Sequence, residues 1–134
     1  MARKTTEFTV TTEGRDKGKT FQITEMPAAQ VEAWAMRALL ALMASGEDMP
    51  EGFELNGMAG IAEKGLKALS KLKWDVAAPL LEEMMECVKV IPDVMRPQVV
   101  RGLIESDIEE VSTRIQLRIE VWKLHTDFLQ AVKA

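Results

Sequence analysis

The segment from residue 30 to residue 45 constrains the fold most, because it is predicted to be helical and has almost no polar face. Its polar residues are Gln30, Glu32, Arg37 and Ser45. A helix that is apolar nearly all round must be covered on several sides. A chain of 134 residues has limited material for that cover. We therefore expect this helix to be a core element, or to present part of its surface to another protein.

A β-hairpin signal precedes this helix. Residues 7–13 and 19–25 alternate in polarity and are rich in Thr and Phe, as half-buried strands are. The loop between them has a glycine at each end, which suits a longer hairpin loop. Pro27 fits the first position of a helix and Gly46 fits a C-terminal cap. The sequence thus predicts a hairpin over residues 7–25 and a helix over residues 27–45.

Apolar residues at helical spacing predict two further helices in the middle of the chain, over residues 57–72 and 75–91. Pro79 leaves the start of the second one open. Either this helix begins near Ala78, or it has a first turn from Asp75 and a kink at the proline.

The last predicted helix runs over residues 106–132, without Gly or Pro, and opens on a capping-box pattern at Ser106 and Glu109. Residues 46–56 and 92–105 are predicted loops, the latter with an extended piece at 99–100. The expected fold is α+β and mainly α, as one domain over residues 1–134. An N-terminal hairpin packs on about four helices in the region 27–132, and the C-terminal helix is long.

Composition excludes several classes of function. The net charge of −4 and the lack of a long basic run argue against a nucleic-acid partner. A single cysteine, Cys87, excludes an internal disulfide and favours a reducing compartment. No apolar stretch reaches the ~20 residues that a membrane span needs, and the N-terminus lacks the apolar core of a secretory signal. We expect a soluble, cytoplasmic protein without a membrane partner.

The residues that usually perform catalysis are scarce. His125 is the only histidine and has apolar neighbours, and Cys87 lies between apolar residues, so both are predicted to be structural. The carboxylates at 82–86 and 105–110 fit helix surfaces and a helix start. We therefore predict no enzyme, no cofactor and no metal site.

Residues 14–19, GRDKGK, lack the full phosphate-loop spacing, and a strand follows them where that motif requires a helix. They are interpreted as a basic hairpin tip, for which contact with an acidic partner is an alternative role.

The apolar helix divides into two predicted faces. One face is expected to be core and consists of Val31, Trp34, Ala35, Ala38, Leu39 and Leu42. Met36, Leu40 and Met43 lie on another flank and need cover of their own. They are core in a tight bundle, or they bind a partner through flexible, polarizable side chains. These three residues are the predicted partner-binding site.

Three segments resemble the tail assembly chaperones of long-tailed bacteriophages: EGRDKGKTFQITEMPA, EAWAMRALLALMASG and DIEEVSTRIQLRIEVWKLHTDFL. The resemblance covers the hairpin, the entry to the apolar helix and the C-terminal helix. It implies a non-enzymatic assembly factor that binds the tape measure protein and helps recruit subunits of the major tail tube protein. Such a factor acts in the host cytoplasm and is left out of the mature virion. The alternative is a structural virion component, such as a tail terminator or head–tail connector, and the oligomeric state is left open.

Overall fold

The computed structural model describes residues 3–44 and 72–126, which belong to two compact units. The first unit comprises Met1–Glu25 and Met84–Leu124, and the second comprises Met26–Glu83 and His125–Ala134. The first contains a sheet and most of one helix (α4), and the second contains one helix (α1) and most of another (α3).

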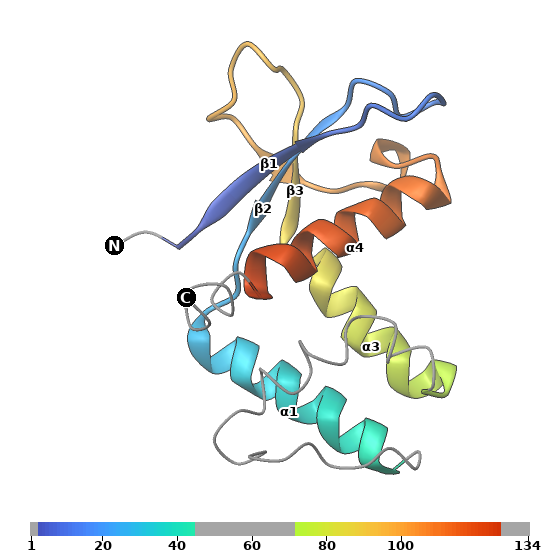
Figure 1. Cartoon of the computed structure of the whole chain (residues 1–134). Coiled ribbons are helices and arrows are strands. Elements are labelled where there is room, and N and C mark those ends of the chain that lie inside the picture. Colours follow the sequence, from blue (N-terminus) through green and yellow to red (C-terminus); the bar gives the residue numbers. More distant parts are fainter. Residues whose placement is uncertain (1–2, 45–71, 127–134) are drawn as a thin grey trace. The chain divides into compact units, whose positions relative to one another are not determined.

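The sheet of the first unit has four antiparallel strands in the order β1-β2-β3-β4 (Figure 1). Their bounds are β1 Thr5–Thr9, β2 Thr20–Thr24, β3 Val88–Ile91 and β4 Arg101–Gly102. Phe21 of β2 stands opposite Phe8 of β1 on one side and opposite Val90 of β3 on the other. Strand β2 is paired along both edges, and the side chains of Phe21 and Ile23 have no contact with solvent. They form the centre of this core.

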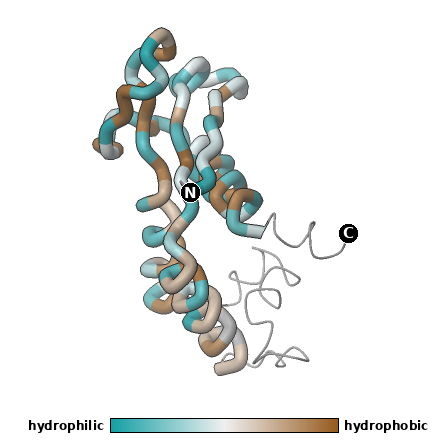
Figure 2. Tube along the Cα trace, turned by 90° about the vertical axis from the view of Figure 1, so that its left-hand side faces the viewer, coloured by the Kyte–Doolittle hydropathy of each residue, from teal (hydrophilic) through white to brown (hydrophobic). Residues whose placement is uncertain are grey.

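Helix α4, Val111–Thr126, runs along the hairpin. Near its start the Gln116 side chain donates a hydrogen bond to the Thr12 hydroxyl, with 3.0 Å between Nε2 and Oγ1. Near its end the Lys4 ammonium donates to the Leu124 carbonyl at 3.4 Å. Between these contacts Leu117 is fully buried. In addition to these buried residues, α4 has other hydrophobic residues between hydrophilic ones along its length (Figure 2).

The second unit pairs α1, Ala28–Ala44, with α3, Trp74–Met85. The Trp34 indole N–H donates a hydrogen bond to the Leu80 carbonyl at 3.0 Å, and both residues are buried. Small residues of both helices, among them Ala38 and Ala77, are buried with them. Small side chains let two helices approach closely. Of the predicted core face, Trp34, Ala35 and Ala38 are buried, whereas Val31 is half-buried.

The predicted packing of a hairpin on about four helices is wrong. The described residues form three helices, α1, α3 and α4, together with a four-stranded antiparallel sheet, so the fold is α+β with a larger β part. The main cause is residues 88–91, which were predicted to end the helix over 75–91. They form β3, because the β-branched side chains of Val88, Val90 and Ile91 suit a pleated surface and pair with β2.

The hairpin and the helix over 27–45 are confirmed, with bounds shifted by a few residues. Helix α3 begins at Trp74 and contains Pro79, so it does not start near Ala78. The predicted start of the last helix at Ser106 is wrong: this residue lies in a short 3₁₀ turn, Glu105–Asp107, and α4 begins at Val111. The predicted loop 46–56, the predicted helix 57–72 except for its last residue, and the stretch 127–132 lie outside the described residues.

Candidate functional site

The predicted partner-binding residues share one side of α1 and will be called the α1 flank: Met36, Leu40 and Met43. Their spacing of four and three residues places them on one face of a helix. Leu40 is 52% exposed, and the two methionines are half-buried. The opposite face, with Trp34 and Ala38, is buried. The side chains of Leu39 and Leu42, predicted to be core, lie outside the described part of the structure.

The charge of Arg37, beside the α1 flank, is compensated within the unit. The Arg37 guanidinium contacts the Glu83 carboxylate, with 2.6 Å between Nη2 and Oε1. The Gln30 amide also donates to this carboxylate, at 3.2 Å. A partner on the α1 flank therefore meets an apolar leucine between two adaptable methionines, next to a neutralised ion pair.

In the first unit, the loop at the hairpin tip holds a buried carboxylate, Asp16, which caps α4. Its oxygens accept hydrogen bonds from the backbone N–H groups of Glu109 and Glu110, each at 2.9 Å at closest approach. The Thr113 hydroxyl donates at 2.7 Å and the Lys19 ammonium at 3.0 Å. Asp16 thus satisfies the N–H groups of the two residues that precede α4 and contacts Thr113 in its first turn, as a capping side chain does.

These contacts determine the charge of Asp16. Burial of the carboxylate raises its pKa, but hydrogen bonds, first from the Thr113 hydroxyl and then from the Glu109 N–H, outweigh burial. The pKa of Asp16 is therefore held well below its usual value, and the side chain stays ionised.

Arg15 adds a second connection between the loop and the start of α4. Its guanidinium pairs with the Glu110 carboxylate and donates to the Glu109 carbonyl at 2.8 Å. Gly14 is required beside it, because its φ of +147° is one that other residues rarely adopt. A Cβ there would also lie 2.7 Å from a Glu110 carboxylate oxygen. The segment Gly14–Asp16 therefore attaches the hairpin loop to the start of α4.

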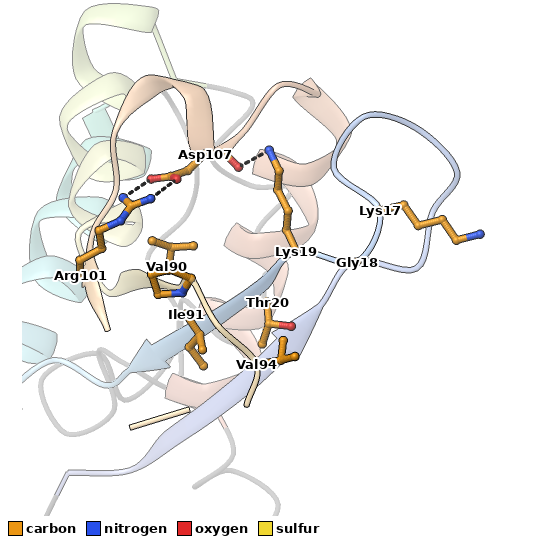
Figure 3. Close-up of a pocket in the computed structure, with 10 residues that line it drawn as sticks. Lys17, Gly18, Lys19, Thr20, Val90, Ile91, Val94, Arg101 and Asp107 are labelled. Carbon is orange, nitrogen blue, oxygen red and sulfur yellow. Dashed lines mark hydrogen bonds and ion pairs between the residues drawn. The ribbon is translucent and has the colours of Figure 1, made fainter. Parts of the chain in front are cut away.

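A pocket of about 440 Å³ opens beside the hairpin tip (Figure 3). Its lining combines basic and apolar side chains with one carboxylate: Lys17, Gly18, Lys19, Thr20, Val90, Ile91, Pro92, Val94, Arg101 and Asp107. The Arg101 guanidinium donates to both oxygens of the Asp107 carboxylate, at 2.9 and 2.8 Å. This bidentate pair is drawn in the upper left part of Figure 3.

Each basic residue of this pocket already has a carboxylate partner. The three hydrogens of the Lys19 ammonium are taken by the Asp16 carboxylate and by the carbonyls of Ser106 and Asp107. Lys17 extends away from the Arg101–Asp107 pair (Figure 3) and pairs with Glu13. The hydrogen bonds and ion pairs around the pocket thus hold the turn before α4 against the hairpin. Because the basic side chains already have carboxylate partners, the pocket does not favour binding of a free anion.

The residues predicted to be structural lie in structural settings. His125 accepts a hydrogen bond from the Met26 backbone N–H at its Nε2 atom, with a separation of 2.8 Å. Cys87 is buried. Among the described residues, no three or more His, Cys, Asp or Glu side chains are grouped so that they could hold a metal ion. No helix in the described ranges is long and apolar enough to cross a membrane.

Sequence reasoning missed the role of Asp16. The available signal was one acidic residue among basic ones between two glycines, but its partners follow 93 and more residues later in the chain. Comparison with protein-family models gave no match, and searches of curated proteins and of solved structures found no similar protein.

Proposed function

We propose that this protein is a tail assembly chaperone of a long-tailed bacteriophage. In this role it binds the tape measure protein in the host cytoplasm, keeps it soluble, helps recruit tail tube subunits and is left out of the mature virion. The sequence resemblance suggests the role, and the α1 flank is the observation that supports it. Leu40 stands 52% exposed between two half-buried methionines on a helix whose other side is core.

The size of this surface suits repeated, reversible binding. Complete burial of a Leu or Met side chain contributes roughly 1.5–3 kcal/mol. Because the three side chains are already partly covered, one docking event would gain only a few kcal/mol before association costs. A single contact is therefore weak, and several copies of the chaperone along a long tape measure protein would hold it by many weak contacts.

The chemistry of the α1 flank favours an amphipathic helix as the bound segment. Leucine offers a fixed anchor, and methionines adjust to partners of different shape. Helical segments dock apolar positions at i, i+3, i+4 and i+7 against such surfaces. Since Arg37 is neutralised by Glu83, recognition here depends on apolar burial more than on charge.

The test is co-expression of this chain with the tape measure protein of the same phage. We expect the tape measure protein to become soluble and to co-purify with the chain. The variant Leu40→Asp, and more strongly the double variant Leu40→Asp with Met43→Asp, should lose this association. Val76→Asp is the matched control, because it places the same charge on an exposed apolar residue of α3 in the same unit. Circular dichroism should show that all variants are folded.

Two results would contradict the proposal. If the tape measure protein stays insoluble with the wild-type chain, the chaperone role fails. If Leu40→Asp and Val76→Asp behave alike, the α1 flank is not the binding surface. Mass spectrometry of purified mature phage supplies an independent check, because detection of this chain there would favour a structural virion component.

A further inference from the structure

The sheet of the first unit has two edge strands, and they are protected to different degrees. Strand β4 has only two residues, and the guanidinium of its Arg101 is held by the Asp107 carboxylate. Strand β1 has five residues, which pair one to one with β2 and form no bulge. They include no lysine, arginine or proline, and Glu7 is the only charged residue among them. Short length, lysine, proline or a bulge usually protects an edge, so β1 is the edge that can accept another strand.

The backbone groups on the free edge of β1 belong to Thr5, Glu7 and Thr9. The Val10 N–H donates a hydrogen bond to the Lys19 carbonyl just before β2, at 2.9 Å, so Val10 directs its backbone groups towards β2. This direction alternates along an antiparallel strand, and the residues at odd positions therefore direct their N–H and C=O groups away from β2. Among the residues that the structure describes, no strand pairs with β1 on this side.

The hydrophobic core is incomplete along the same edge. Phe8 of β1 and Phe21 of β2 stand opposite each other on the core face of the sheet. Phe21 has no contact with solvent, whereas Phe8 is only half-buried and Thr6, on the same face, is exposed. A strand added beside β1 would therefore cover a large apolar side chain in addition to the free backbone groups.

The sequence of β1 suits antiparallel pairing with a second copy of itself about a two-fold axis. Because Thr5, Glu7 and Thr9 carry the free backbone groups, they must pair with one another, and the axis then passes through a single residue. An axis at Glu7 would place two carboxylates opposite each other, which is destabilising. An axis at Phe8 places the two phenyl rings opposite each other and sets Glu7 against the uncharged Thr9. This register satisfies the edge and also covers Phe8.

We propose that this protein forms a dimer through β1, in which the sheets of two copies join into one continuous sheet. Glu7 of each copy exchanges backbone hydrogen bonds with Thr9 of the other, and the two Phe8 rings cover each other. The paired segment is short, so the association is weak and reversible. The site lies in the first unit and shares no residue with the α1 flank in the second. It therefore stands or falls separately from the proposed chaperone role.

The first test is analytical ultracentrifugation of the full chain between about 10 and 500 µM, where weak association is measurable. The wild-type chain should shift from monomer to dimer as its concentration rises. Glu7→Pro removes an outward N–H group without removing a hydrogen bond to β2, and it should weaken the dimer at least about tenfold. Glu7→Ala keeps this N–H group, so it is the matched control and should dimerise like the wild type. Circular dichroism should show that both variants are folded.

Cysteine cross-linking tests the register. Phe8→Cys places two thiols at the axis, where the facing Cα atoms of an antiparallel pair without mutual hydrogen bonds lie about 4.5 Å apart. A disulfide spans this distance. Thr6→Cys is the control on the same face, because its two copies would lie about 13 Å apart along the strands. Mild oxidation should therefore cross-link Phe8→Cys and not Thr6→Cys, while the native Cys87 is buried.

Three results would overturn the proposal. One is a wild-type chain that stays monomeric at the highest concentration. Another is a dimer that Glu7→Pro leaves unchanged, because a different surface would then form it. The third is equal cross-linking of Phe8→Cys and Thr6→Cys, which would contradict the axis at Phe8. If Glu7→Pro does not fold, the comparison of the two cysteine variants decides alone.

Discussion

The α1 flank and the outer face of α4 both expose apolar residues on a helix, but they offer a partner different chemistry. The α1 flank combines Leu40 with two flexible methionines, and the adjacent arginine is neutralised by Glu83. The outer face of α4 consists of the stiff β-branched side chains of Val111, Ile115 and Ile119, which are 73%, 48% and 40% exposed. The comparison shows that exposed apolar residues alone do not define a partner. Side-chain flexibility and neighbouring charge decide whether a surface is tolerant or selective.

The largest effect is expected from removing the support of the α4 face. Asp16→Ala leaves the N–H groups just before α4 without their acceptor and removes one of the three acceptors of the Lys19 ammonium. Breaking such a buried charged network should lower the free energy of unfolding by about 3 kcal/mol. Urea denaturation measures this loss.

Glu13→Ala is the control for Asp16→Ala, because it removes an exposed carboxylate from the same loop. Its expected effect is below about 0.5 kcal/mol. Similar losses for both variants would mean that the buried cap does not stabilise α4.

Low pH should weaken the same contacts of the Asp16 carboxylate in the wild-type chain. The pKa of Asp16 is lower in the folded protein than its ordinary value. The stability that this carboxylate contributes is therefore fully present above the unfolded pKa of about 4, and it is lost as the pH falls towards the folded value. The stability difference between wild type and Asp16→Asn should be constant above about pH 5 and shrink below about pH 4. A difference that does not change over this range would contradict the role of the ionised carboxylate.

Salt should have little effect on binding to the α1 flank. Between 50 and 500 mM NaCl, association of the tape measure protein should change less than about twofold, because this surface relies on apolar burial. Co-purification at the two salt concentrations measures the change. A several-fold loss of association at high salt would mean that charges, and not apolar burial, dominate the contact.

The smallest effect is expected at the tip of the hairpin. Lys17→Ala removes an exposed lysine whose ion-pair partner, Glu13, is also exposed. Thermal unfolding should show a change below about 0.5 kcal/mol. A larger loss would show that the tip, and not only Asp16, supports the start of α4.

The sequence predicted the elements whose signals are local. Alternation of Phe and Thr indicated the hairpin, and Pro27 and Gly46 closely bracketed α1. Strand β3 was missed because it follows α3 after a two-residue turn, so its apolar residues continued the helical spacing. Pairing with β2, a segment more than sixty residues earlier in the chain, decided the structure of these residues. No local pattern contains that information.

The candidate sites, too, could be predicted only where the sequence signal is local. The α1 flank could be predicted because helical spacing separates it from the core face. The outer face of α4 could not be predicted, because the apolar residues of a helix that is apolar on two sides have no single preferred direction. The pattern therefore does not reveal which side is buried. The start of α4 was placed at Ser106 from a local capping pattern, whereas the true cap comes from the distant Asp16. Long-range contacts outweighed local signals in each case.

The cap of α4 also determines the order in which the chain can fold. Asp16 is synthesised early, but the first backbone N–H group from which its carboxylate accepts a hydrogen bond belongs to Glu109, 93 positions later. At about 5–20 residues per second, the ribosome needs roughly 5–20 s to supply that donor. Until then the carboxylate must stay in water, because burial without its donors is costly. The hairpin is therefore the first part of its unit to be made, but it reaches its final state only after one of the last helices has arrived.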